Sequence, residues 1–153
     1  RHLPRDQMMH LPTRTPFAAL AAWVLLALLA TAARAETRQF GAYELHYSVF
    51  TSDFLQPDIA AAYGIVRAKD RALLNVAVRR DGATVGATLA GTRSDLIRKT
   101  PLEFREIREE QAVYYIAEFG FVDGETVYFD ISVLPAGETR PLVLQFQQVL
   151  YAD

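Results

Sequence analysis

Apolar and polar side chains alternate along most of the chain after Phe40, with the period of two that a β-strand with one buried face requires. The clearest stretch is 127–133, where four aliphatic or aromatic residues alternate with Tyr, Asp and Ser. Shorter or weaker alternation predicts the other strands, which lie at about 43–49, 72–80, 84–92, 102–107, 113–121 and 142–151. The pattern therefore predicts about seven short strands.

Turn signals separate these strands at spacings of ten or so residues. Asp81-Gly82 and Asp123-Gly124 are dipeptides that favour tight hairpins, because both residues tolerate positive φ. Residues 57–63 are typical of one short helix, with Pro57 in the first turn and Gly64 as the stop. The glycines in 84–92 indicate an edge or bulged strand, and 94–100 fits either a turn or one helical turn. Short strands separated in this way are typical of an antiparallel β-sandwich.

The first 35 residues carry a different pattern. Three arginines precede an apolar run of 16 residues at 17–32, and Ala33 and Ala35 then place small residues at the two positions that a signal peptidase reads. A helix needs about 20 apolar residues to cross a bilayer, so the run is short for a membrane span. We predict a signal peptide over 1–35 that forms a signal helix, with an uncleaved membrane anchor as the alternative.

Two consequences follow from this prediction. Because Met8 and Met9 stand just upstream of the apolar run, we expect the natural start there and residues 1–7 to be an artefact of start-site assignment. After cleavage, we expect residues 36–153 to form a single exported β-sandwich domain, with no stable membrane span.

Removal of the leader makes the remaining chain acidic. Of the 16 basic and 18 acidic residues, 12 and 17 lie in 36–153, which gives a net charge of −5. This charge argues against a nucleic-acid partner, because binding to phosphates needs clustered Lys and Arg. The chain has no Cys, and His46 is the single histidine left after export. Catalytic triads and His- or Cys-based metal sites need more than that, so we expect no catalytic residue, no cofactor and no metal.

Carboxylates are the remaining candidates for chemistry. Five glutamates are close in sequence and two of them could face each other across the 102–121 hairpin; they are Glu103, Glu106, Glu109, Glu110 and Glu118. General acid or base catalysis requires one carboxylate to be desolvated with a raised pKa. Arg105 and Arg108 interleave with the glutamates and would keep them ionised. We therefore expect a cross-strand ladder of salt bridges here.

Two clusters are candidate binding surfaces. The first is an Arg-rich connection beside the end of the short helix, which suits an anion or an acidic partner; it comprises Tyr63, Arg67, Lys69 and Arg71 and ends near Asn75. The second combines Arg105 and Arg108 with Tyr114, which should point outward, away from the side that carries Tyr115. Ordinary solvated surface residues are the alternative interpretation of both clusters.

Several of these stretches, taken together, resemble the domain of unknown function DUF4426 across essentially the whole exported chain. The resemblance rests on Phe54-Leu55-x-Pro57, Ala61-x-Tyr63-Gly64-Ile65, Arg67-x-Lys69-x-Arg71-x₃-Asn75-x-x-Val78, 102–109, 112–119 and Phe146-Gln147-Gln148. It implies an immunoglobulin-like β-sandwich and a small exported protein of Gram-negative bacteria that is located in the periplasm, and it brings no activity, cofactor or catalytic residue. The tip Glu109-Glu110-Gln111 lacks the glycine expected in this family.

The sequence favours a non-enzymatic binding or adaptor module that acts through contacts with a periplasmic protein. A carrier of small ligands is the alternative, because the fifteen Phe and Tyr residues of 36–153 would line a cavity between the sheets as readily as fill a core. A hydrolase that uses carboxylates has the least support.

Overall fold

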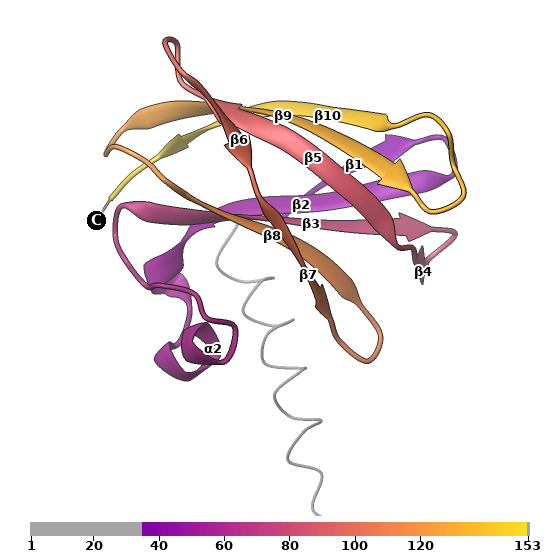
Figure 1. Cartoon of the computed structure of the whole chain (residues 1–153), viewed down its shortest axis with the longest axis horizontal. Coiled ribbons are helices and arrows are strands. Elements are labelled where there is room, and N and C mark those ends of the chain that lie inside the picture. Colours follow the sequence, from indigo (N-terminus) through magenta and orange to yellow (C-terminus); the bar gives the residue numbers. More distant parts are fainter. Residues whose placement is uncertain (1–34, 153) are drawn as a thin grey trace, which may run out of the picture.

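Residues 35–152 are described by the structure, a computed structural model in which two antiparallel sheets face each other (Figure 1). The first sheet, sheet A, contains β1 (Glu36–Phe40), β2 (Tyr43–Thr51), β3 (Arg71–Arg80), β4 (Ala83–Thr84), β7 (Phe104–Arg108) and β8 (Val113–Gly120). Sheet B contains β5 (Ala87–Ser94), β6 (Lys99–Leu102), β9 (Glu125–Pro135) and β10 (Leu142–Leu150). Between β2 and β3 lie the 3-10 turn η1 (Ser52–Phe54) and the helix α2 (Pro57–Ala62).

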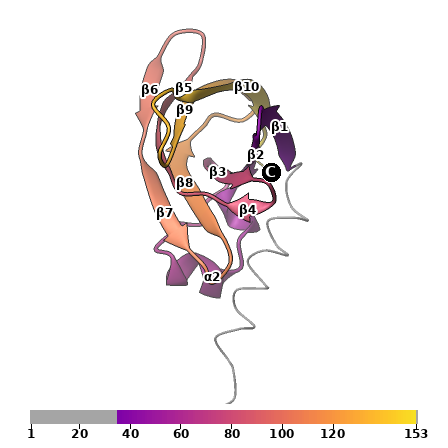
Figure 2. The same ribbon diagram turned by 90° about the vertical axis from the view of Figure 1, so that its right-hand side faces the viewer.

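The chain passes from one sheet to the other several times. Sheet A has the order β1-β2-β3-β8-β7, with β4 also paired to β3, and sheet B has the order β10-β9-β5-β6. Crossings occur between β4 and β5, between β6 and β7 at Glu103, and between β8 and β9. In Figure 2, β6 and β7 follow one another along one side of the molecule. Each sheet is therefore completed by strands that are distant in sequence.

The structure confirms the all-β sandwich and the short helix at 57–62. Each of the seven predicted strands is present, and the structure adds β1, β4 and β6. Asp81 and Gly82 have φ values of 51° and 78°, as the predicted hairpin requires. Residues 95–98 form the loop between β5 and β6.

Two predictions about strand connections are wrong. Asp123-Gly124 does not close a hairpin, because β8 and β9 belong to different sheets and the turn carries the chain across the sandwich. The strand predicted at 84–92 splits in two, and its longer part, β5, lies between β9 and β6 and is not an edge. Its Gly91 is needed for close packing: a Cβ atom at this position would lie 2.6 Å from the Asp130 carbonyl oxygen.

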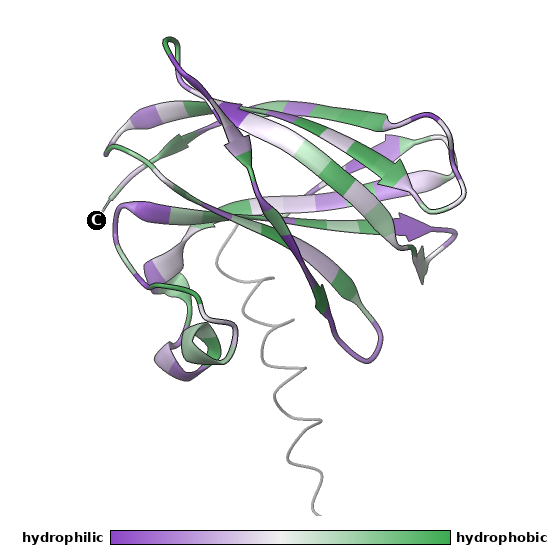
Figure 3. Ribbon diagram, in the orientation of Figure 1, coloured by the Kyte–Doolittle hydropathy of each residue, from purple (hydrophilic) through white to green (hydrophobic). Residues whose placement is uncertain are grey.

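The main core lies between the two sheets and contains buried residues of both; Figure 3 shows hydrophobic and hydrophilic positions alternating along these strands. Its aromatic rings pack on one another. Phe146 lies 4.6 Å from Tyr47 and 4.7 Å from Phe129 between ring centroids, and Phe129 lies 5.4 Å from Phe119. These four rings thus fill the core, which favours the packed-core interpretation of the aromatic residues over a ligand cavity.

A second hydrophobic cluster lies on the opposite, outer face of sheet A. There residues 52–70, which we call the α2 segment, cover β3, β8 and β7 with side chains that include Leu55 and Ile65. As a result β3 is buried on both faces, and the consecutive Leu73 and Leu74 are both 0% exposed. Tyr114 belongs to this outer cluster and is 6% exposed.

The predicted signal peptide, with Ala33 and the signal helix, lies outside the described residues. Among residues 35–152, no helix is long and apolar enough to cross a membrane.

Candidate binding surface

The two ends of the α2 segment are held together by one buried hydroxyl. Ser52 is 1% exposed and follows β2 directly. Its Oγ lies 2.8 Å from the Val66 carbonyl oxygen and 3.1 Å from that of Ala68, and it accepts a hydrogen bond from the Ala68 backbone N–H at 2.9 Å. The two ends of the α2 segment are thereby joined, so the residues between them form a closed loop on the sheet.

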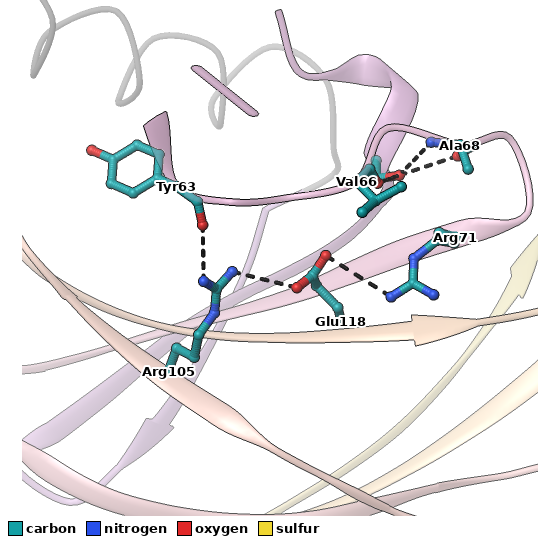
Figure 4. Close-up of polar contacts among 7 residues, drawn as sticks. Tyr63, Val66, Ala68, Arg71, Arg105 and Glu118 are labelled. Carbon is teal, nitrogen blue, oxygen red and sulfur yellow. Dashed lines mark hydrogen bonds and ion pairs between the residues drawn. The ribbon is translucent and has the colours of Figure 1, made fainter. Parts of the chain in front are cut away.

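A chain of polar contacts connects this segment to β3, β8 and β7 (Figure 4). The Arg105 guanidinium donates a 2.8 Å hydrogen bond to the Tyr63 carbonyl oxygen and a second, of 3.4 Å, to the Glu118 carboxylate. The other Glu118 oxygen lies 4.0 Å from Arg71. Figure 4 shows both arginines directed toward Glu118 from opposite sides. One carboxylate thus holds two cations at the border of the α2 segment.

Tyr63 forms a further link between the α2 segment and sheet A. Its hydroxyl donates a hydrogen bond to the Glu109 carboxylate, at the tip of the β7–β8 hairpin. Burial of the hydroxyl, followed by this hydrogen bond to Glu109, raises the pKa of Tyr63 to about 12. Tyr63 therefore stays protonated at neutral pH and acts as a hydrogen-bond donor.

An exposed apolar and basic patch lies where the two ends of the α2 segment meet. Phe54 and Val66 are 59% and 61% exposed, although most large apolar side chains of the molecule are buried. Arg67 is exposed beside them and donates a 2.9 Å hydrogen bond to the Asp53 carbonyl oxygen. We call Phe54, Val66 and Arg67, with the neighbouring Lys69 and Arg71, the rim patch.

Four of the five residues of the predicted first surface lie in the α2 segment or directly after it. Tyr63, Arg67 and Lys69 belong to the α2 segment, and Arg71 begins β3 directly after it. Asn75 is the exception, because its side chain is only 7% exposed, on the face of β3 that carries Leu73. The Oδ1 atom of Asn75 is buried and has no hydrogen-bond partner. Asn75 therefore lies beneath the surface and not on it.

The predicted second surface does not exist as one surface. Arg105 reaches the α2 segment, whereas Arg108, three residues later on the same strand, pairs with Glu106 on the other face of β7. The prediction that Tyr114 points outward is wrong. Its side chain does leave the sheet on the face opposite Tyr115, but the outer cluster covers that face. Arg105 instead joins the first surface through Tyr63 and Glu118.

Two of the five glutamates are paired with arginines, but only the contact between Arg105 and Glu118 joins β7 to β8 as the predicted cross-strand ladder requires. Glu106 contacts Arg108, and Glu118 contacts Arg105 and Arg71. Glu106 lies opposite Tyr115, whose side chain is in the main core, while Glu118 emerges on the outer face beside Leu73. The two carboxylates therefore lie on opposite faces of sheet A and do not form a pair.

Sequence analysis did not assign Phe54 to a binding surface, although it is an apolar residue outside any alternating segment. Val66 lay within the predicted Arg-rich connection without a role of its own, and Glu118 was assigned only to the ladder of salt bridges. Within residues 35–152, no group of three or more His, Asp or Glu side chains could hold a metal ion.

Comparison with known proteins gives a family and a shared fold. The model of the family described as "Domain of unknown function (DUF4426)" matches residues 37–153. The crystal structure of a DUF4426 family protein from Pseudomonas aeruginosa PAO1 is similar, with 38% sequence identity and a TM-score of 0.71, over 78% of this chain and 96% of that one. No curated protein matches the chain.

Two structures of FetP from uropathogenic E. coli strain F11 share the fold at 10% identity. One is the "as isolated" protein expressed recombinantly in the periplasm of E. coli BL21(DE3), with a TM-score of 0.54 over 78% of this chain and 95% of that one. The other is a copper-bound variant, with a TM-score of 0.56 over 79% and 97%. At this identity the likeness concerns the fold alone.

Proposed function

The chain belongs to the DUF4426 family, and from that premise we propose that it is a non-enzymatic, periplasmic protein-binding module that recognises its partner through the rim patch. One observation carries the proposal: Phe54 and Val66 are well exposed beside Arg67 on a segment that Ser52 holds in place. Aromatic, aliphatic and arginine side chains in one pre-ordered patch are the composition of interface hot spots.

The charges of the patch indicate the chemistry of the partner. Arg67, Lys69 and Arg71 gather at one place in an exported chain whose net charge is −5. We infer a partner segment that places an apolar side chain against Phe54 and Val66 and a carboxylate against the arginines.

The proposal of a non-enzymatic role rests on how the reactive groups are used. His46 lies on β2 at the sheet surface, where it contacts Glu44 and Thr37. The carboxylates of Glu106 and Glu118 are paired with arginines on different faces. The copper bound by the FetP variant is no argument for a copper site in this chain, because at 10% identity the likeness concerns the fold alone. The proposal that the protein is exported rests on the signal peptide predicted at 1–35.

Site-specific photo-crosslinking in the source bacterium tests the function. The full chain, with its own leader, carries the photoreactive residue at position 54 or 66, or at Val122, an apolar control that is 73% exposed on the β8–β9 connection. We expect one protein to be crosslinked at 54 and 66, to be lost with Arg67→Glu, and to be absent at 122. The same adducts at all three positions, or none at 54 and 66, would contradict the proposal.

Binding of the crosslinked protein, once purified, gives the quantitative test. Phe54→Ser should weaken the affinity about tenfold or more, which is the effect of losing a hot-spot side chain. The variant should unfold at the same urea concentration as the wild type, because Phe54 is 59% exposed. An unchanged affinity would remove the rim patch as the binding site.

A further inference from the structure

One edge of sheet B lacks the features that keep sheet edges from pairing. β10 (Leu142–Leu150) is nine residues long and contains no charged residue, proline or glycine. Within residues 35–152, the other edge strands of four or more residues all carry such residues: Glu36 and Arg38 in β1, Lys99 and Pro101 in β6, and Arg105, Glu106 and Arg108 in β7. Charges and proline on an edge strand oppose pairing with another chain. β10 is therefore the edge that is open to an additional strand.

On this edge the backbone N–H and C=O groups of β10 are not paired with another strand. The Leu150 carbonyl accepts a hydrogen bond from Gly124, at the start of the neighbouring β9. The Gln145 carbonyl instead accepts one from Arg38 of the other sheet. Since successive residues of a strand direct their N–H and C=O groups to opposite sides, the odd-numbered residues 143–149 direct theirs away from β9.

The side chains of these odd-numbered residues occur in the same order in both directions along β10. Val143, Gln145, Gln147 and Val149 are exposed on the outer face of sheet B and form a palindrome centred on Phe146. In an antiparallel pair of two β10 strands centred on this residue, Val143 faces Val149 of the second copy and Gln145 faces Gln147 of the second copy. A two-fold symmetric interface requires this kind of self-complementarity.

We propose that β10 pairs with β10 of a second copy of this chain, so that two four-stranded sheets become one continuous eight-stranded sheet. In this register the odd-numbered residues of one β10 lie opposite the odd-numbered residues of the other. Their backbone N–H and C=O groups point toward each other, so each opposed pair exchanges two hydrogen bonds. The opposed valines add apolar contact and the glutamines pair amide with amide. The surface is separate from the rim patch, which lies on the outer face of sheet A, so either proposal can fail without the other.

Arg38 limits the strength of this pairing. Its guanidinium donates a 2.8 Å hydrogen bond to the Gln145 carbonyl and a 3.3 Å one to the Tyr47 hydroxyl. A second β10 strand competes with Arg38 for the Gln145 carbonyl, so the pairing is a reversible, concentration-dependent equilibrium. Arg38→Ala removes the competitor and should tighten the dimer severalfold.

Charge pairs placed on the exposed valines test the register. In the proposed dimer, Val143→Lys with Val149→Lys sets lysine opposite lysine at two places, whereas Val143→Lys with Val149→Glu sets lysine opposite glutamate at both. The two valines are 49% and 41% exposed, so both double variants should fold. Sedimentation analysis of residues 36–153 from micromolar to millimolar concentration gives the dissociation constants.

We expect the wild type to dimerise, the lysine–lysine variant to dimerise about tenfold or more weakly, and the lysine–glutamate variant to recover most of the loss. If net charge alone mattered, the lysine–lysine variant would dimerise more strongly than the lysine–glutamate variant. Two added lysines reduce the repulsion between chains of charge −5, whereas a lysine and a glutamate leave that charge unchanged. A wild type that stays monomeric at every concentration, or equal dissociation constants for the two double variants, would overturn the proposal.

Discussion

The two hydrophobic regions of this molecule lie on opposite faces of the same strands and are built differently. The main core joins two sheets and is lined by alternating apolar residues of strands from both. The outer cluster has one sheet face and a single covering segment, and polar groups are buried around it: Asn75 and Asp53 each have a side-chain oxygen without a hydrogen-bond partner. The first arrangement provides stability. The second gives up some stability and leaves the apolar and basic rim patch exposed.

The largest expected effect on stability comes from substitution of two neighbouring leucines, one in each region. Leu74 lies in the main core and Leu73 in the outer cluster, and both are 0% exposed. Leu74→Ala should lower the free energy of unfolding by about 3–4 kcal/mol, and Leu73→Ala by about 2–3 kcal/mol, because the thin α2 segment relaxes around a cavity more easily. Urea unfolding measures both values. Equal losses would show that the two regions are equally rigid.

Substitution of Gly91 tests how closely β5 packs against the neighbouring strand β9 in sheet B. A Cβ atom on this residue would lie 2.6 Å from the Asp130 carbonyl oxygen and 2.7 Å from Ile131 Cδ1. Gly91→Ala should therefore cost about 2–3 kcal/mol in thermal or urea unfolding. Gly86→Ala is the matched control, since its nearest contact would be at 3.9 Å, and it should leave the unfolding midpoint almost unchanged. A neutral Gly91→Ala would disprove the close approach.

Ser52 tests whether the outer cluster can open by itself. Ser52→Ala removes the hydroxyl that joins the two ends of the α2 segment and should cost about 1–2 kcal/mol. Hydrogen exchange should speed up at residues 55–66 and stay unchanged in β9 and β10, because the main core does not depend on this bond. Ser132→Ala, on a partly exposed position of β9, is the control. Uniform acceleration along the chain would show that the two regions unfold together.

The smallest effect is a pH dependence of stability that comes from Tyr63. Its hydroxyl has a pKa of about 12 in the folded chain, against 10.0 for an unperturbed tyrosine. As the pH rises from 10 toward 12, the unfolded chain loses this proton before the folded chain does, so folding becomes less favourable. Between pH 10 and pH 12 the urea concentration at the midpoint of unfolding should fall less for Tyr63→Phe than for the wild type, because the variant lacks this hydroxyl. Tyr151→Phe, at a residue 62% exposed, serves as the control and should fall as the wild type does.

Sequence analysis predicted the main core better than the outer cluster. Alternation in β8 placed Val113, Tyr115 and Ala117 on one face, and the structure places all three in the main core. Tyr114 was assigned to solvent because nothing within β8 shows that the α2 segment, some fifty residues earlier, covers it. The uninterrupted apolar pairs of β3, such as Leu73-Leu74, were the available sign of burial on both faces.

The strand connections show the same limit. Asp81-Gly82 and Asp123-Gly124 are equally good turn dipeptides, yet the first closes a hairpin and the second leads from sheet A to sheet B. A dipeptide determines the local backbone angles, such as the φ of 75° at Gly124. Which strand pairs after the turn depends on the packing of the whole sandwich.

Seven of the strands, the faces that they turn to the main core and the short helix follow from the sequence alone, because they depend on residues within a few positions of one another. Tertiary structure alone decides that Arg105 meets Glu118 and Tyr63 while Arg108 turns away, and that Asn75 is covered. Tertiary structure also leaves the uncharged strand β10 at an edge. These features join residues far apart in the chain, and their energies depend on a register that local periodicity does not contain.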